Sequence, residues 1–393
     1  MSCFDEKLDR RGTNCMKWDV ADKAFEAEDV IPMWVADMDF ATPRAVTEAI
    51  IRRATHGAFG YNVVPQSYYD SIINWIGRRH DWHIEKDWIV YTPGVIPALY
   101  WAVGAFTKPG EKVLVQSPVY YVFYNAIAAR KRDVVCNELM RTEHGYRIDF
   151  EDLEQKLADP SVTLMIFCSP HNPVGRVWTR QELEQVSDLC RKHHVLLVSD
   201  EIHSDLVWKG HKHIPIASVS QNSAQNTITC TAPSKTFNLA GLSTANAIIP
   251  NKDIRDRFCE ERRTSAIHAP DTFGMVALQA AYDHGEVWLE DLLEYLAENY
   301  ACLETYLAEH IPEIKPLRPE GTYLIWLDFS ALNMNKEELK SFLNREARVA
   351  MDQGPWFGAG GDGFARMNIA CHRSTLLQAL ARLENAIRNR APK

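Results

Sequence analysis

The chain of 393 residues lacks the features that place a protein in a membrane or outside the cell. It has no run of about 18 apolar residues, so we expect no membrane-spanning helix. Its first 20 residues, MSCFDEKLDRRGTNCMKWDV, are polar and contain no apolar core of a signal peptide. Its nine cysteines are odd in number and form no CxxC pair, which favours reduced thiols and a cytoplasmic location.

Positive charge is scarce relative to negative charge. The sequence has 43 Lys and Arg against 52 Asp and Glu, a formal net charge of −9. Coating nucleic acid needs clustered Lys and Arg, so we expect no nucleic-acid partner. We also predict no metal site, because the histidines at positions 193, 194, 211 and 213 are not spaced for ligation with Cys or a carboxylate.

The sequence does have an ordinary globular composition, with 46% hydrophobic and 24% charged residues. Short apolar runs rich in β-branched residues alternate with helical patterns such as 181–194, where Leu183, Val186 and Cys190 form one stripe. Such runs suit strands buried on both faces, and the alternation predicts an α/β fold with a mostly parallel sheet. The runs lie at 112–116, 162–168, 195–199, 227–231 and 246–249.

The pattern changes after about residue 285, where strands and helices no longer alternate regularly. We therefore predict an N-terminal arm over 1–45, a large domain over 46–285 and a smaller α+β domain over 286–393, with the arm packed on the small domain. The elements expected in the small domain are a long amphipathic helix at 286–310, strands at 323–329, 349–351 and 365–370, and helices at 336–348 and 374–390.

Polar clusters stand at the ends of the predicted strands. In an open α/β sheet, ligands bind outside the carboxyl ends of the strands. Four clusters directly follow apolar runs and a fifth precedes a helical run, which is more than chance scatter, so we expect one functional site there. The clusters are Thr92–Val95, Ser117–Tyr121, Ser169–Gly175, Asp200–His203 and Ala232–Thr236.

These clusters resemble those of the fold-type I pyridoxal-phosphate enzymes, the aminotransferase superfamily. The likeness is strongest to the MalY/PatB-type cystathionine β-lyases, the cystalysin-like carbon–sulfur lyases, and it extends over nearly the whole chain. Each motif alone is weak evidence, but their order and spacing together are specific. The motifs are VADMDF (35–40), SPHNPVGRVW (169–178), DEIHSDL (200–206), APSKTFNLAGL (232–242) and GFARMNIA (363–370).

The resemblance implies a pyridoxal 5'-phosphate cofactor attached to Lys235. A lysine beside a cationic, partly desolvated ring has a lowered pKa, so it can act as nucleophile and then as base. Asp200 would pair with the pyridine nitrogen, and Asn172 would hydrogen-bond the phenolic oxygen of the ring. On residue type alone, Lys235 could be a surface lysine, Asp200 could cap a helix and Asn172 could be a turn residue.

The resemblance also assigns groups around the ring and the phosphate. Tyr120 would stack on the ring and Tyr121 would take part in proton movement, although either could be a plain core aromatic. The phosphate would meet backbone N–H groups of Gly94 and Val95 at a helix N-terminus, together with the Ser234 hydroxyl.

A homodimer is implied as well, because Tyr61 matches a tyrosine that reaches the phosphate from the neighbouring subunit. Two positions depart from many aminotransferases and follow the lyase pattern. Ser243 stands eight residues after Lys235, where an arginine often holds the phosphate. His203 stands three residues after Asp200, where a tyrosine often touches the ring oxygen.

Arg366 resembles the arginine that clamps the substrate carboxylate, since a planar guanidinium matches a carboxylate, and Ala36 aligns with a backbone contact to the same group. The implied activity is β-elimination from L-cystathionine or a related L-cysteine S-conjugate, giving a thiol such as homocysteine, pyruvate and ammonia. The alternative on this scaffold is an aminotransferase. A regulatory protein is a third reading, but the segment before the scaffold is too short and acidic for a DNA-binding helix pair.

Overall fold

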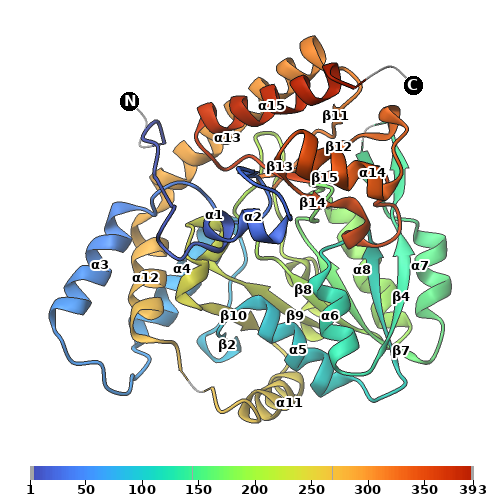
Figure 1. The fold of residues 1–393 in the computed structure, drawn as a ribbon. Coiled ribbons are helices and arrows are strands. Elements are labelled where there is room, and N and C mark those ends of the chain that lie inside the picture. Colours follow the sequence, from blue (N-terminus) through green and yellow to red (C-terminus); the bar gives the residue numbers. More distant parts are fainter. Residues whose placement is uncertain (1–3, 144, 268, 391–393) are drawn as a thin grey trace.

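A computed structural model of the chain describes residues 4–143, 145–267 and 269–390. Its centre is a seven-stranded sheet (Figure 1). Only β10 runs against the others, being antiparallel to both of its neighbours, so the predicted mostly parallel sheet is confirmed. In spatial order the strands are β2 (Ile89–Thr92), β10 (Ala245–Ile248), β9 (Thr227–Thr231), β8 (Leu196–Asp200), β7 (Val162–Cys168), β3 (Lys112–Ser117) and β4 (Asp133–Glu138).

Helices cover both faces of this sheet, which explains why its strands are continuous apolar runs. On β7, Ile166 packs into the cluster formed with α5 (Val95–Phe106), α6 (Val122–Ala129) and α11 (Lys252–Arg263). Its neighbours Met165 and Phe167 point to the opposite face, against α7 (Phe150–Leu157) and α8 (Arg180–Lys192). The remaining elements of this region are the hairpin β5 (Met140–Thr142) and β6 (Gly145–Arg147) and the short helices α9 (Gln221–Gln225) and α10 (Pro233–Thr236).

A second, antiparallel sheet lies toward the C-terminus (Figure 1). Its strand order is β11 (Lys315–Pro316), β12 (Leu324–Asp328), β15 (Phe364–Asn368) and β14 (Asp352–Gln353). Helix α13 (Glu286–His310) is 25 residues long and packs against the last helix, α15 (Arg373–Arg388). Together the two helices bury an apolar stripe of leucines. Further helices of the fold are α3 (Arg44–Thr55), α4 (Gln66–His80), α12 (Thr272–His284) and α14 (Lys336–Ser341).

The N-terminal segment lies against the C-terminal part of the chain. It carries two short helices, α1 (Met16–Asp19) and α2 (Ala21–Ala24), and the strand β1 (Ile31–Pro32), which pairs in parallel with β13 (Val349–Ala350). Phe4 packs its ring against Trp288 at the start of α13. The boundaries drawn at residues 45 and 285 remain predictions.

The structure corrects three local expectations. Asp200 is the last residue of β8 and not the first residue after it. The helical run expected after the cluster Thr92–Val95 begins within that cluster, because α5 starts at Val95. The helix expected over 336–348 ends at Ser341, because Phe342–Glu346 widens into a π-helical turn that buries Phe342 and Asn344. Within the described ranges, no helix is long and apolar enough to cross a membrane.

Asn238 ties the N-terminal segment to the end of β9 that carries α10. Its side-chain amide accepts a hydrogen bond from Met38 N at 3.0 Å and donates to the carbonyls of Met38 and Phe40, both at 2.9 Å. Its backbone has φ +58°, a left-handed conformation that asparagine tolerates better than most residues. One side chain therefore fixes segment 38–40 beside α10.

We expect Asn238→Ala to destabilise the fold by about 3 kcal/mol, since it removes three hydrogen bonds and leaves alanine in a left-handed conformation. Thermal unfolding by circular dichroism measures the change. Asn333→Ala is the matched control, because Asn333 is also left-handed (φ +50°) but its side chain, among the described residues, donates only to the Ala331 carbonyl two residues away. The prediction fails if both variants lower the melting temperature equally.

Candidate active site

A cavity of about 250 Å³ lies at the carboxyl end of the central sheet. It brings together residues from five predicted clusters and from the N-terminal segment, as expected where parallel strands end at one edge. Predicted site residues that line it are Ala36, Gly94, Val95, Tyr120, Asn172, Asp200, His203, Ser234 and Lys235.

Lys235 projects from α10, the short helix that follows β9. Its Nζ donates a 2.6 Å hydrogen bond to the backbone carbonyl of Ala36. Burial lowers the pKa of the amine to about 8, with the charge of Arg366 acting in the same direction and those of Asp37 and Asp200 opposing it. A fraction of the amine is therefore uncharged near neutral pH, as a nucleophile or base requires.

Asp200 is a buried carboxylate with little to stabilise its charge. The only hydrogen bond found for it within the described chain comes from Ile202 N, at 3.1 Å. Burial raises its pKa to about 7, despite that bond and the charge of Lys235. His203 lines the same wall, its Nδ1 is buried without a partner, and burial holds its pKa well below the usual value.

The N-terminus of α5 forms the anion-accepting end of the cavity. Gly94 is the N-cap residue and offers no side chain, so the first N–H groups of this 12-residue helix lack a capping side chain. A Cβ at Gly94 would approach the Pro97 ring to 3.3 Å. The helix dipole and free N–H groups favour an anion here, next to the hydroxyl groups of Ser234, Ser243 and Thr244.

Arg366, on β15, is buried behind the cavity with only 2% of its surface exposed. Its Nη1 donates to Asn172 Oδ1 at 2.8 Å, and its Nη2 donates to the Trp34 carbonyl at 3.2 Å. It also forms an ion pair with Asp352, a buried carboxylate whose pKa burial raises. Since Asn172 uses its Oδ1 for Arg366, its Nδ2 is left to donate toward the cavity.

Besides Arg366, two predicted residues do not line the cavity. Tyr121 lies next to it, with its ring 4.9 Å from that of Tyr120 and 6.2 Å from that of Trp356. Tyr61 is fully exposed on the loop after α3, so nothing within its own chain places it at this cavity. Its assignment to a neighbouring subunit remains a prediction.

Some site residues were missed from the sequence. Cys168 lines the cavity, although nothing in the sequence assigned it to the site. Tyr323 donates from its hydroxyl to the Ala36 carbonyl at 3.0 Å, which gives that carbonyl a second partner. Asp352 lies on a two-residue strand with no sequence pattern that would have identified it. Within the described chain, no group of three His, Cys, Asp or Glu side chains could hold a metal ion.

The sequence model of the family described as aminotransferase class I and II matches residues 28–383. The chain belongs to this family. It is 44% identical to the cystathionine β-lyase PatB of Bacillus subtilis (strain 168), over 98% of this chain and 99% of that protein. It is 36% identical to protein MalY of Escherichia coli (strain K12), over 98% of each chain.

Solved structures agree with this membership of the aminotransferase family. Cystalysin from Treponema denticola, whose crystal structure contains a pyridoxal 5'-phosphate cofactor, matches with a TM-score of 0.96 and 38% identity over 99% of both chains. Within the class I and II family, the chain therefore belongs with the MalY/PatB-type cystathionine β-lyases, and its fold is the fold-type I fold.

The cavity of this aminotransferase-family chain fits pyridoxal 5'-phosphate. The amine of Lys235 can attach an aldehyde, and the unpaired carboxylate of Asp200 suits a protonated ring nitrogen. The bare N-terminus of α5 suits a phosphate. These three groups occur in one cavity, and within the described chain neither Lys235 nor Asp200 forms an ion pair and no side chain caps α5.

Replacing Asp200 tests the cost of its buried charge. Since its folded-state pKa of about 7 lies above the ordinary 3.8, the penalty is absent at low pH and complete above about pH 7. We expect Asp200→Asn to stabilise the cofactor-free chain by roughly 2–4 kcal/mol near pH 8 and by less near pH 5. Thermal unfolding across this range measures the effect.

The opposite sign is expected for Asp328→Asn, because Asp328 is paired with Arg141 and its pKa is lowered. A stability loss at pH 8 for Asp200→Asn, like that of Asp328→Asn, would contradict the account of Asp200 as an unpaired buried charge.

Proposed function

We propose that this chain is a pyridoxal-phosphate-dependent carbon–sulfur β-lyase that cleaves L-cystathionine and related L-cysteine S-conjugates to a thiol, pyruvate and ammonia. The observation that carries the proposal is that Lys235 and Asp200 line one cavity, with Arg366 directly behind it and bonded to the lining residue Asn172. The names of the relatives, cystathionine β-lyase PatB and cystalysin, support it. With cystathionine as substrate the thiol is homocysteine, which belongs to methionine metabolism.

The bound cofactor supplies an electron sink for the carbanion that forms at the substrate Cα. Asp200 would keep the ring nitrogen protonated, because a buried carboxylate with a raised pKa shares a proton or pairs with a cation. Asn172 would donate from Nδ2 to the phenolic oxygen, and Tyr120 would pack against the ring. Gly94 and Val95 would hold the phosphate with backbone N–H groups.

Lys235 both attaches the cofactor and moves the proton at Cα. Once the substrate amine takes its place, Nζ would be free to remove the Cα proton, and the pKa of about 8 leaves the amine partly unprotonated near neutral pH. The Cβ–sulfur bond would then break, a thiolate would leave, and water would hydrolyse the remaining enamine to pyruvate and ammonia. Tyr121 stays a protonated phenol at neutral pH, because burial raises its pKa, so it can give a proton to the departing sulfur.

Arg366 orients the substrate through its carboxylate, aided by the backbone at Ala36. Its guanidinium already bonds Asn172 and the Trp34 carbonyl, which fixes the plane of the fork before substrate arrives. His203 would lie beside the cofactor as a neutral ring, and the Ser234 hydroxyl would donate a hydrogen bond to the phosphate.

An aminotransferase remains the second candidate, because the family is named for that reaction and the same groups serve it. The two reactions differ in the fate of the carbanion. A lyase expels a Cβ substituent, whereas an aminotransferase reprotonates the intermediate and then needs a keto acid to complete its cycle.

We expect the purified chain, supplied with pyridoxal 5'-phosphate and L-cystathionine alone, to release pyruvate steadily. Lactate dehydrogenase coupling measures the rate. Lys235→Ala should lower kcat at least about 100-fold. Lys252→Ala is the control, because Lys252 is exposed and pairs only with Asp256. Turnover that requires an added keto acid would favour the aminotransferase instead.

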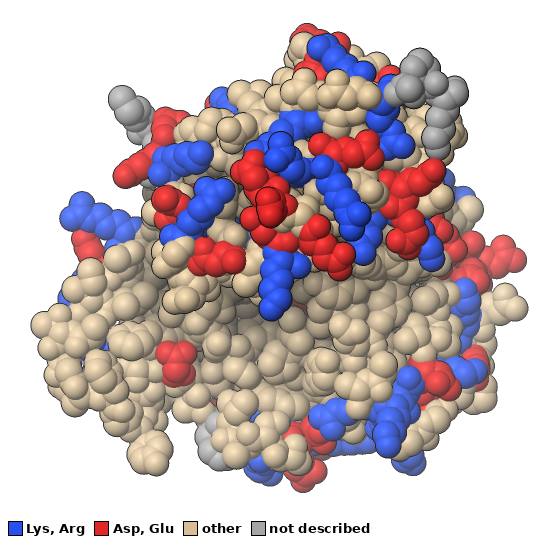
Figure 2. Space-filling view, viewed as in Figure 1, with Lys and Arg blue, Asp and Glu red and all other residues tan. Residues whose placement is uncertain are grey.

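We propose further that the enzyme is a cytoplasmic homodimer in which Tyr61 reaches the phosphate of the neighbouring subunit. Ile51, Phe59, Tyr61 and Val63 expose apolar surface around the end of α3. Figure 2 shows that the surface at the lower left, over this part of the chain, carries few charged side chains. Such a patch favours burial against another protein. The eight described cysteines are free thiols, as in a reducing compartment.

Mixing two inactive variants tests the sharing of sites. In a heterodimer of Tyr61→Ala and Lys235→Ala, one site carries both defects and the other carries neither. After co-refolding, we expect recovery of up to about a quarter of wild-type activity. Pyruvate release measures it. If Tyr61 acts in its own chain, every site keeps one defect and the mixture stays at the level of the parents.

A further inference from the structure

The two cationic residues of the site both donate to one short segment of the N-terminal arm. Lys235 Nζ bonds the Ala36 carbonyl at 2.6 Å, and Arg366 Nη2 bonds the Trp34 carbonyl at 3.2 Å. Segment 34–40 has no helix or strand of its own. One backbone hydrogen bond, from Asp39 N to the Ala370 carbonyl at 2.9 Å, ties it to the C-terminal part of the chain. Side-chain contacts hold the rest of it, among them Asn368 Nδ2, which donates to the Val35 and Asp37 carbonyls at 2.6 Å. The position of the Ala36 carbonyl depends on these contacts.

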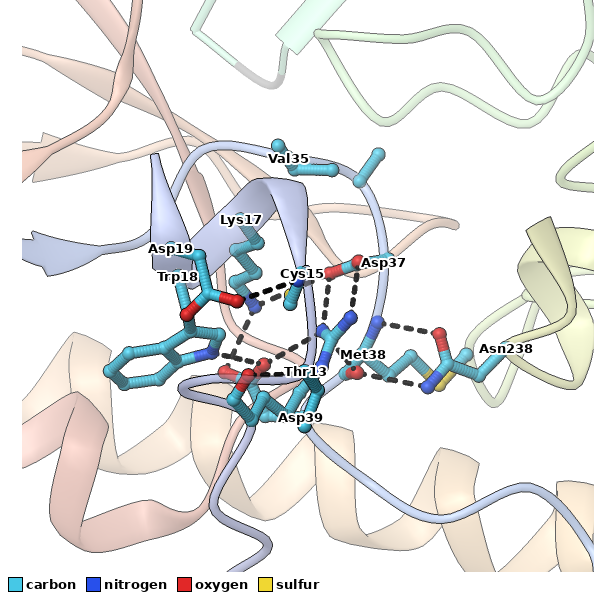
Figure 3. A network of polar contacts seen from close by, with 12 residues as sticks. Thr13, Cys15, Lys17, Trp18, Asp19, Val35, Asp37, Met38, Asp39 and Asn238 are labelled. Carbon is cyan, nitrogen blue, oxygen red and sulfur yellow. Dashed lines mark hydrogen bonds and ion pairs between the residues drawn. The ribbon is translucent and has the colours of Figure 1, made fainter. Parts of the chain in front are cut away.

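Arg10 makes the most extensive of these contacts, with Asp37, Met38 and Asp39, which Figure 3 labels. Its Nη1 and Nη2 each donate to an oxygen of Asp37 at 2.8 Å, a paired arrangement that only arginine provides. Nη1 also donates to the Met38 carbonyl at 2.9 Å and to Asp39 Oδ1 at 3.0 Å. One guanidinium thus holds three consecutive residues of the segment.

A second cation completes the arrangement around Asp39. Lys17 is fully buried and donates to Asp39 Oδ2 at 3.0 Å, with Asp37 Oδ1 at 3.8 Å. Trp18 Nε1 donates to Asp39 Oδ1 at 2.8 Å. Asp39 therefore keeps two partners when Arg10 is replaced, whereas Asp37 loses its closest one.

We propose that Arg10 is a positioning residue for Lys235, because its ion pair with Asp37 holds the Ala36 carbonyl against the lysine amine and offsets the charge of Asp37 there. The inference rests on the proposed function only in giving Lys235 its chemical role. Neither Arg10 nor Asp37 lines the cavity, so neither touches the cofactor or substrate.

The charge of Asp37 acts on Lys235 directly, since it is the largest of the opposing charges that raise the lysine pKa. Removing Arg10 leaves that charge less compensated, and the lysine pKa should rise. Removing the charge of Asp37 should lower it. The other groups that act on Lys235 are Arg366 and Asp200, while Tyr323 also faces Asp37 and His203 faces Lys235.

The experiment measures the Lys235 pKa in the full cofactor-free chain, by competitive acetylation with acetic anhydride across pH and quantification of the Lys235 peptide by mass spectrometry. Relative to wild type, Arg10→Met should raise the pKa by about 0.5 to 1, and Asp37→Asn should lower it by a similar amount. Arg382→Met is the control, because Arg382 pairs with Asp29 elsewhere in the arm.

Arg10→Lys separates position from charge. It keeps the positive charge but loses the paired contact, so the lysine pKa should stay near that of wild type. The looser segment should still slow capture of pyridoxal 5'-phosphate by about tenfold, measured by growth of the visible absorption band. If Arg10→Met destabilises the fold, Asp37→Asn still tests the effect of charge on the Lys235 pKa, and Arg10→Lys still tests the effect of position on cofactor capture.

Opposite displacements in Arg10→Met and Asp37→Asn, absent in Arg382→Met, would support the proposal. Displacements of the same sign, or none, would overturn it, because a merely structural ion pair would disturb Lys235 equally in both variants. The acetylation readout needs neither cofactor nor substrate. An aminotransferase reaction, or no reaction at all, would therefore overturn the proposed function without affecting this result.

Discussion

The hydrogen bond from Lys235 to the Ala36 carbonyl joins two parts of the chain that lie 199 residues apart. One end belongs to the short helix after β9, and the other belongs to an arm segment without regular structure. Asn238 bonds that segment from the side of α10, and Tyr323 bonds it from the second sheet. The arm, the central sheet and the C-terminal part of the chain therefore meet at a few backbone carbonyls beside the cavity.

Desolvation gives this cavity its chemistry, and a comparison of two aspartates shows how. Asp200 and Asp205 are both buried and lie five residues apart. The side chains of Trp75, His80 and Thr236 donate hydrogen bonds to Asp205 at 2.8–3.2 Å. Burial would raise the pKa of Asp205, but these partners lower it. Asp200 has one backbone donor and a raised pKa. Asp205 therefore has a structural role, whereas Asp200 is suited to pair with a cation that binds in the cavity.

The sequence predicts the site well where regular structure brings residues together. Asp200, Lys235 and Asn172 follow parallel strands, and such strand ends meet at one edge whatever the loops between them do. Arg10 and Asp352 could not be found in this way. Their contacts join irregular segments, and neither periodicity nor strand order determines which residues of such segments come into contact. The contacts of Tyr61 cannot be derived from a single chain, because its predicted neighbours belong to another subunit.

The bond between Arg366 and Asn172 links the group proposed to bind the substrate carboxylate to a residue proposed to lie at the cofactor ring. If Arg366 has this role, a ligand carboxylate that draws the guanidinium toward itself changes what the Asn172 amide accepts. A simple amine has no carboxylate and would leave this bond as it is. Under the proposed function, the bond would therefore make the site respond differently to an amino acid than to a simple amine.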